Sequence, residues 1–265
     1  MNFIPDAEKK LSKDFEKNGY IIKNIQDLNS LEKLQKIFLK IIKKNVKETS
    51  KKSSDEILNF IHNKIKKNEL NNLRLKIINE INKNKDTRKL YYNLAKPYLD
   101  ILVGNELAMQ IRVNLSVQLP GDSSSLLPVH SDVWSGDSPF EIVVWLPLVD
   151  CYKTKSMYIL PPTKVQKLNK IFLKKGRQSS EKIFKLIKKQ VTWLNIKYGQ
   201  VLLFNQTLPH GNRINREKET RWSLNCRFKG VFTPYRDKRL GEFFEPITLR
   251  KISQLAIKYN LPKIK

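Results

Sequence analysis

The sequence has little of what builds disulfide frameworks or membrane spans. It holds two cysteines, Cys151 and Cys226, too few for the disulfide-rich scaffold of a small secreted protein. No apolar run approaches the roughly 20 residues that a membrane-spanning helix needs, and the opening MNFIPDAEKK lacks the apolar region of a signal peptide. These absences predict a cytoplasmic protein without a membrane span.

Acidic side chains are also scarce, since 25 Asp and Glu stand against 51 Lys and Arg and leave a formal net charge of +26. Chains this basic often meet nucleic acid, anionic lipid or phosphorylated substrates. A lysine-rich surface can equally reflect the codon bias of a genome, in which case the charge implies no partner.

The positive charge is concentrated in residues 163–190, which carry ten Lys or Arg against Glu181 alone. Apolar residues recur there at helical spacing on both sides of Gly176, which predicts an insertion of two short amphipathic helices. Two interpretations stay open. The lysines form a solvated outer face, or the helices form a lid that presents cations to an anionic substrate.

Histidine is the scarcest candidate ligand, with three in 265 residues. His130 lies in LLPVHSD, two residues before Asp132, and His210 lies in TLPHG. Two histidines and one aspartate form the facial triad that holds non-haem iron and leaves positions open. If LLPVHSD is extended, His130 and Asp132 share one face of a strand. The third histidine, His62, is predicted to be an exposed helix residue and no ligand.

The segments around His210 strengthen this hypothesis. Residues 193–198 predict a strand that turns at Gly199-Gln200, and 201–204 (VLLF) predict a buried strand leading to His210-Gly211. The following TRWSLNCRFK alternates strictly, with Arg221, Ser223, Asn225 and Arg227 on one face and Trp222, Leu224, Cys226 and Phe228 on the other. An arginine fork beside a hydroxyl suits a carboxylate; the alternative is a strand with a solvated polar face.

The order H-x-D, WLPLVD, ILP, GxVLLF, HG and R-x-S resembles the iron(II)- and 2-oxoglutarate-dependent oxygenases, and within them the phytanoyl-CoA dioxygenase-like branch. Residues 126–158 are similar to oxygenases of sporadically distributed bacterial surface-carbohydrate gene clusters. The resemblance is dense from about residue 100 to 235, and before that only FEKNGYIIK matches the opening strand of the branch. The chain departs from many relatives at Lys155-Ser156 and at 161–163 (PPT), where they carry Asn-Gly and a P-G-S-H element.

The resemblance implies a set of roles. Iron(II) is held by the catalytic residues His130, Asp132 and His210, while dioxygen and 2-oxoglutarate are co-substrates. The implied 2-oxoglutarate contacts are Arg221, Ser223, Asn114 and Gln118, and the expected substrate contacts include Trp134, Tyr158 and Arg227. The implied reaction converts 2-oxoglutarate to succinate and CO2 and hydroxylates a C–H bond. The implied substrate is a carbohydrate, a nucleotide-linked sugar or another small anionic metabolite of surface polysaccharide biosynthesis.

The implied fold is α+β, with a double-stranded β-helix (jelly-roll, cupin-like) barrel as its core. We expect one oxygenase domain over 1–265: a helical N-terminal buttress over 1–105, a barrel over 106–235 and a helical C-terminal tail over 236–265. Within these parts, the patterns predict helices at 31–42, 57–61, 70–81 and 90–102, a polar break at 47–56, and strands at 20–22, 109–119 and 141–148, with Trp145 in the core.

Two other functions fit parts of the sequence. One is a catalytically silent, cupin-like protein that binds a partner such as nucleic acid through its basic face, with the triad incidental. The other is an oxygenase that acts on nucleic acid or protein. Nucleic-acid binding commonly uses aromatic rings for stacking, but the 163–190 insertion has only Phe172 and Phe184, both at core-like positions. We therefore favour a small-molecule or carbohydrate substrate.

Overall fold

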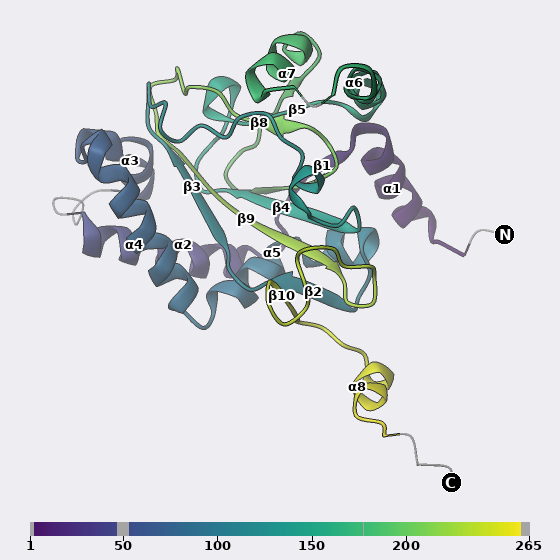
Figure 1. Ribbon diagram of the computed structural model, residues 1–265. Coiled ribbons are helices and arrows are strands. Elements are labelled where there is room, and N and C mark those ends of the chain that lie inside the picture. Colours follow the sequence, from purple (N-terminus) through teal and green to yellow (C-terminus); the bar gives the residue numbers. More distant parts are fainter. Residues whose placement is uncertain (1–2, 47–52, 177, 261–265) are drawn as a thin grey trace.

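The computed structural model describes residues 3–46, 53–176 and 178–260. It is a mixed α and β structure with two antiparallel sheets (Figure 1). The larger sheet has the order β1 (Tyr20–Asn24), β7 (Gln200–Asn205), β4 (Glu141–Pro147), β9 (Arg221–Gly230), β2 (Leu107–Gln110) and β10 (Phe244–Pro246), and β3 (Asn114–Gln118) also pairs with β9. The smaller sheet has the order β6 (Thr192–Trp193), β5 (Tyr158–Ile159) and β8 (His210–Gly211).

The longest strand, β9, organises the larger sheet because it pairs with β4 along one edge and with β3 and then β2 along the other. Its alternation is as predicted. Trp222, Leu224, Cys226 and Phe228 are fully buried in the hydrophobic core, whereas Arg221, Asn225 and Arg227 line a cavity on the opposite face.

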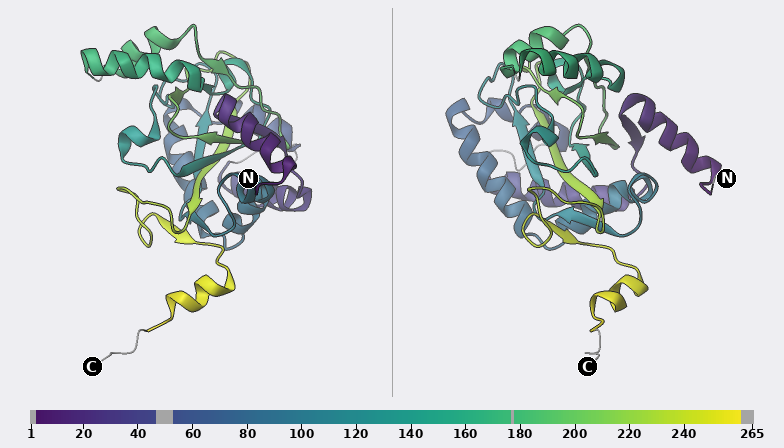
Figure 2. Two further views of the ribbon diagram at one scale, coloured as in Figure 1. Left: turned by 90° about the vertical axis from the view of Figure 1, so that its right-hand side faces the viewer. Right: turned by 45° about the vertical axis from the view of Figure 1, so that its right-hand side comes forward.

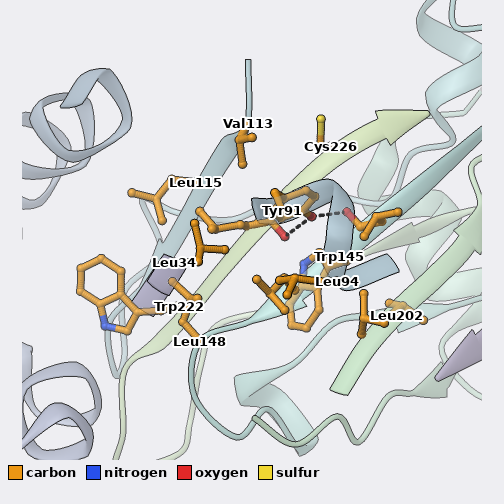
Figure 3. Close-up of a cluster of buried hydrophobic side chains, with 14 of the residues drawn as sticks. Leu34, Tyr91, Leu94, Val113, Leu115, Trp145, Leu148, Leu202, Trp222 and Cys226 are labelled. Carbon is orange, nitrogen blue, oxygen red and sulfur yellow. Dashed lines mark hydrogen bonds between the residues drawn. The ribbon is translucent and has the colours of Figure 1, made fainter. Parts of the chain in front are cut away.

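Helices from the N-terminal part cover the apolar face of this sheet (Figures 1 and 2). They are α2 (Leu28–Asn45), α3 (Ser54–Asn59), α4 (Leu70–Lys83) and α5 (Thr87–Leu102), while α1 (Asp6–Asn18) lies beside the edge strand β1. Tyr91 on α5 lies near Leu34, Leu94 and Trp145 (Figure 3), and its buried hydroxyl donates to the carbonyl of Val144 at 2.8 Å. An apolar helix stripe must be buried against another layer, and this sheet provides it.

Phe38 on α2 is the ring that ties this helix layer to β9. Its ring meets that of Trp222 edge-on, with 5.4 Å between centroids, and only 1% of Phe38 is exposed. We expect Phe38→Ala to lower the free energy of unfolding by about 3–5 kcal/mol, because it leaves a cavity that the buried ring of Trp222 cannot move to fill. Urea denaturation measures the change, and Phe3→Ala, at a position 90% exposed, is the control. Equal effects of the two substitutions would contradict this account of the core.

The insertion also folds as predicted, into α6 (Pro162–Lys175) and α7 (Ser180–Ile187). Gly176 ends α6 with a positive φ of 67°, a conformation that glycine adopts without strain. Leu168, Ile183 and Ile187 are buried in a second apolar cluster, which contains Val129 and Tyr158 as well. The insertion therefore packs against the smaller sheet, over the end of the molecule that carries β5 and β8 (Figures 1 and 2).

Several local predictions are wrong. The expected strand over 109–119 is broken between β2 and β3 at 111–113, and the expected strand over 193–198 keeps only β6 and an isolated bridge at Ile196. The expected helical tail contains β10, which pairs with β2, and up to residue 260, where the description ends, its helix is α8 (Lys251–Ile257). His62 is half-buried in a short 3₁₀ turn, where its Nδ1 lies 2.9 Å from the hydroxyl of Thr220.

The other helix predictions hold with small shifts, and residues 47–52 of the predicted polar break lie outside the described residues. Helix α1 is an addition that the local pattern did not specify. Among the residues that the structure describes, no helix is both long enough and apolar enough to cross a membrane.

Candidate metal centre and its cavity

The three predicted ligands meet although they are far apart in sequence. The donor atoms of His130, Asp132 and His210 all lie within 4.8 Å of one another. His130 and His210 are joined by a pair of main-chain hydrogen bonds, 3.0 Å from N of His130 to O of His210 and 2.8 Å in return. A single β-bridge thus places two imidazole rings side by side, with 4.3 Å between their centroids.

The expected strand through His130 and Asp132 is absent. Asp132 instead begins a 3₁₀ turn (Asp132–Ser135), and its main-chain N–H donates to the carbonyl of Gln206. The chain turns toward the site between the two residues, so that Asp132 Oδ1 comes within 3.5 Å of His130 Nε2. The two ligands therefore face one point through a turn and not through the two-residue repeat of a strand.

Both histidines are oriented for metal binding by their own main chain. Nδ1 of His130 lies 2.8 Å from the carbonyl oxygen of Pro128, and Nδ1 of His210 lies 2.9 Å from that of Leu208. A carbonyl accepts, so each Nδ1 is the donor, and each Nε2 is turned toward the site. Burial acts to lower the pKa of His130, but the hydrogen bond with Asp132 outweighs burial and raises that pKa above its ordinary value. A metal ion would displace the proton that His130 Nε2 shares with Asp132. Burial, aided by the neighbouring His130, lowers the pKa of His210 to about 4 and keeps that ring neutral. Neutral, outer-bonded imidazole is the form that ligates metals.

Asp132 is held as an anion. Its burial acts to raise the pKa, but the hydrogen bond with His130 and the positive surroundings, Arg227 among them, outweigh burial and hold the pKa well below its ordinary value. An ionised carboxylate beside two Nε2 lone pairs is the donor set of a 2-His-1-carboxylate centre for non-haem iron(II). The residues present therefore fit that metal.

Arg227, predicted as a substrate contact, has another role in the geometry. Its Nη2 lies 3.0 Å from Asp132 Oδ2, its Nε lies 3.3 Å from Asp137 Oδ1, and the same Nε donates to Gln206 Oε1. The guanidinium thus holds the carboxylate of Asp132 on the side away from His130. Asp137 is buried, and burial raises its pKa above the ordinary value.

This contact predicts that Arg227 sets the affinity of the site for its metal. Replacing it by Gln frees the Asp132 carboxylate to rotate, and we expect a roughly 10–100-fold weaker affinity for Fe(II) or Mn(II), the range typical of residues that orient ligands. Anaerobic calorimetric titration measures the affinity, and Arg213→Gln, whose guanidinium pairs with Glu181 instead, is the control. If relief of charge repulsion mattered more than orientation, the affinity would stay equal or rise, and the proposed role would be wrong.

The triad lies in a cavity of about 540 Å³, a volume typical of sites for small molecules. Strands β3, β4, β7 and β9 contribute to its walls together with β8 and the loop over 124–127, and apolar side chains of Val143, Trp145, Met157 and Phe204 line part of it. Trp145, predicted as a core residue, is 5% exposed and belongs to both the core and this wall. Polar and apolar residues therefore share the lining of this cavity.

Arg221 brings an unpaired positive charge to the same cavity. Its Nη2 donates to Ser116 Oγ at 2.7 Å and its Nη1 to the carbonyl of Ser156 at 3.3 Å, while Nε has no partner. Burial lowers the pKa of Arg221 to about 10, which still leaves the group charged at neutral pH. No carboxylate pairs with it among residues 3–46, 53–176 and 178–260. A buried guanidinium without a counter-ion is a receptor for a carboxylate.

The other predicted contacts of 2-oxoglutarate differ in their position relative to the cavity. Asn114 lines the cavity, where its Nδ2 donates to Asn225 Oδ1. Ser223 is fully buried two residues from Arg221, and its hydroxyl has no hydrogen-bond partner. Gln118 does not line the cavity, and its amide donates to the carbonyl of Arg213 instead.

Two predicted substrate contacts lie behind the cavity wall. The ring of Trp134 meets Phe172 of α6 edge-on, and Tyr158 packs between Phe184 and Trp193. Neither residue lines the cavity. None of the described residues of the 163–190 insertion lines the cavity, which favours the solvated face over the lid as the interpretation of its lysines.

Some lining residues have no signal in the sequence. Arg74 and Ile78 come from one face of α4, far from the motifs, and residues 124–127 come from the loop before His130. Gln206 likewise carries no local signal, although it bonds both Arg227 and the main chain of Asp132. An arginine one turn from an isoleucine on an amphipathic helix is a common surface pattern, and only the packing of α4 beside β3 gives it a place at the cavity.

Comparison with known proteins places this geometry in a known fold. No protein-family model matches the chain, and no curated protein matches it in sequence. Among solved structures, EctD from S. alaskensis in its apo form is similar, with a TM-score of 0.55 and 16% identity over 88% of this chain and 81% of that chain.

Two further solved structures match over most of their length. One is SnoK, a non-haem alpha-ketoglutarate-dependent carbocyclase from nogalamycin biosynthesis, with a TM-score of 0.53 and 13% identity over 88% of this chain and 87% of that chain. The other is HygX from Streptomyces hygroscopicus with nickel and 2-oxoglutarate bound, with a TM-score of 0.51 and 12% identity over 88% of this chain and 90% of that chain. The chain therefore shares its fold with a group of proteins that includes non-haem, 2-oxoglutarate-dependent enzymes.

Proposed function

We propose that the protein is an Fe(II)- and 2-oxoglutarate-dependent oxygenase that oxidises a small molecule. The observation that carries the proposal is one cavity holding both a 2-His-1-carboxylate set and, in Arg221, a buried cation without a counter-ion. A metal-ligand set alone would suit many metalloproteins, and a buried arginine alone would suit many anion-binding proteins. Together they match the two needs of this chemistry, a metal with open positions and an anchor for a dicarboxylate.

Bound iron(II) supplies the dioxygen chemistry that oxidises a C–H bond while 2-oxoglutarate becomes succinate and CO2. The chain supplies binding and orientation. His130 and His210 would each bind the metal through Nε2, Asp132 supplies the anionic ligand, and Arg221 holds the distal carboxylate of 2-oxoglutarate. Ser116 and Ser223 are paired across β3 and β9, so their hydroxyls are placed to help Arg221 bind this carboxylate.

The orientation of both histidines argues against an incidental triad. Two separate main-chain carbonyls, of Pro128 and Leu208, accept from Nδ1 and turn Nε2 of both rings toward the site. Apolar walls at Val143, Trp145 and Phe204 would exclude water from reactive species. A catalytically inactive, cupin-like binding protein would need neither the oriented histidines nor the apolar wall, so we favour the enzyme.

The proposal extends to the architecture, the branch and the location. We propose that the two sheets form a double-stranded β-helix within one oxygenase domain, since a single apolar cluster joins the N-terminal helices to β4, β7 and β9. Membership of the phytanoyl-CoA dioxygenase-like branch and a carbohydrate or nucleotide-linked sugar substrate in surface polysaccharide biosynthesis rest on the sequence resemblance alone. A cytoplasmic location is supported by the two free, buried cysteines.

Anaerobic addition of Fe(II) and 2-oxoglutarate to the purified protein tests the assignment. Chelation of iron by the keto acid gives a weak visible charge-transfer band, and we expect it here. Succinate, which lacks the keto group, and Zn(II), which has a filled d shell, are the matched controls that give no band. The absence of the band with Fe(II) and 2-oxoglutarate would overturn the proposed function.

A further inference from the structure

Arg74 is a cation that lines the cavity, and the proposed chemistry assigns it no role. It projects from α4, half-buried, and lines the cavity together with Ile78, one turn along the same helix. Its hydrogen-bond partner is Asn71 Oδ1 on the same helix, at 2.6 Å. Within the described part of the chain no carboxylate pairs with Arg74, and the cavity lining beside it holds neutral polar groups.

The charges that line the cavity do not balance. Three arginines, Arg74, Arg221 and Arg227, stand against the single carboxylate of Asp132. Arg227 is neutralised by its contact with Asp132. In the proposed complex, iron(II) and the three arginines carry five positive charges, while Asp132 and the two carboxylates of 2-oxoglutarate carry three negative charges, so two positive charges remain. Asp132 contacts Arg227 and the distal carboxylate is assigned to Arg221, so Arg74 is the lining arginine left without a carboxylate partner, and its charge favours an anion in the cavity that it lines.

Other residues that line the cavity indicate what the rest of the substrate is like. Asn114 and Asn225 offer amides, Ser124 lies on the facing loop, and Ile78 and Leu127 are apolar. This mixture suits a compact polar molecule with a partly apolar surface. The volume of about 540 Å³ also limits the occupant to a small metabolite or to the end of a larger one.

The lysine-rich insertion does not offer the same contact. None of the described residues of the insertion lines the cavity, and the apolar faces of α6 and α7 are used in packing against the smaller sheet. Glu181, the acid of the insertion, pairs with Arg213 outside the cavity. Among the described residues, an anionic group that enters the cavity therefore meets Arg74 and not a lysine.

We propose that Arg74 is the anion-recognition residue of the substrate site, so that the substrate is a small metabolite bearing a phosphate or carboxylate group. This substrate class rests on the proposed oxygenase function, because the charge balance assumes that 2-oxoglutarate occupies Arg221. The guanidinium binds such a group through two parallel N–H donors, a geometry that a single lysine does not offer.

The test measures anion binding in a form that does not depend on oxygenase activity. The protein is the full chain, free of metal and carrying Arg221→Met, which removes the other unpaired arginine of the cavity. Inorganic phosphate is titrated and the thermal midpoint is recorded, and we expect a saturable rise. Adding Arg74→Ala should weaken the apparent affinity at least about tenfold, the loss of a charge-assisted hydrogen bond. Arg74→Lys should fall in between.

Arg236→Ala is the matched control, because Arg236 is exposed and does not line the cavity, so it removes the same charge elsewhere. It should leave the affinity for phosphate unchanged. Alanine is favourable in a helix, so Arg74→Ala keeps α4 intact. A rise that does not saturate, or one that Arg74→Ala leaves unaltered, would overturn the anion site. Glucose 1-phosphate, glucuronate and uncharged methyl glucoside then separate phosphate from carboxylate, and methyl glucoside should give no shift.

The two proposals can fail separately. Saturable phosphate binding through Arg74 without the charge-transfer band would keep the anion site and remove the oxygenase. The band without phosphate binding would keep the oxygenase and exclude an anionic substrate at this position.

Discussion

Asp132→Ala is expected to abolish metal binding and, with it, turnover of 2-oxoglutarate. The substitution removes the one anionic donor of the triad and leaves two neutral imidazoles beside Arg227, whose charge then faces the metal position. Loss of a ligand should exceed the roughly 10–100-fold cost of losing a residue that merely orients one. Anaerobic titration with Fe(II) or Mn(II) measures the affinity directly, and succinate release measures turnover.

The same substitution removes one of the two carboxylates beside Arg227 and leaves Asp137 as the other, and this loss of a buried charge partner can itself destabilise the fold. Thermal unfolding of the metal-free variant shows whether the protein is folded, and the double substitution Asp132→Ala with Arg227→Gln removes the stranded charge. If the double variant regained metal binding, repulsion by Arg227 and not the missing carboxylate would be the cause. Metal binding by Asp132→Ala at the wild-type affinity would show that the triad is not the metal centre.

The parts of the site that the sequence predicted are those with a strict local period. The two-residue alternation of β9 placed Arg221 and Arg227 on the cavity face and Trp222 in the core, as the structure has them. The helical period placed Leu168 and Ile183 on the inner faces of α6 and α7. These patterns hold because one face of each element is buried, so that a shift of one residue would expose the whole apolar set.

The turn at Asp132 could not be predicted from period. LLPVHSD has apolar residues that are compatible with a strand, but the 3₁₀ turn depends on the hydrogen bond from Asp132 N to Gln206 O, a partner far along the chain. The break in the 109–119 strand has a similar origin. The amide of Asn82 on α4 exchanges two hydrogen bonds with the main chain of Val113, which leaves that residue free of the sheet.

The sequence left open whether the lysines of residues 163–190 form a solvated face or a lid over the substrate. The density of charge along the chain does not decide this question. In the structure a half-buried arginine on α4 lines the cavity, while none of the described lysines does. A count of charges predicts where a surface is basic but not which cation faces a cavity.

Arg221→Met is expected to weaken 2-oxoglutarate binding strongly while leaving metal binding intact. Removing one partner of a buried charge pair costs about 2–5 kcal/mol, and each increment of about 1.4 kcal/mol is a factor of ten. The requirement for 2-oxoglutarate should therefore rise by about 30-fold or more. The charge-transfer band, titrated with 2-oxoglutarate at fixed Fe(II), measures the affinity, and calorimetry with Fe(II) alone should give the wild-type value. Arg221→Lys, which keeps the charge and loses the fork, should lie between the two.

Stability separates this role from a structural one, because the two predict opposite signs. In the protein without 2-oxoglutarate, Arg221 is buried with no carboxylate, its Nε has no partner, and burial lowers its pKa to about 10. Replacing an uncompensated buried charge by an apolar side chain of similar length is often neutral or stabilising. The metal-free Arg221→Met variant should then unfold at or above the wild-type temperature, whereas 2-oxoglutarate should stabilise the metal-loaded wild type alone. A variant that unfolds earlier and still binds 2-oxoglutarate normally would make Arg221 a structural residue, and the carboxylate anchor would have to be sought elsewhere in the cavity.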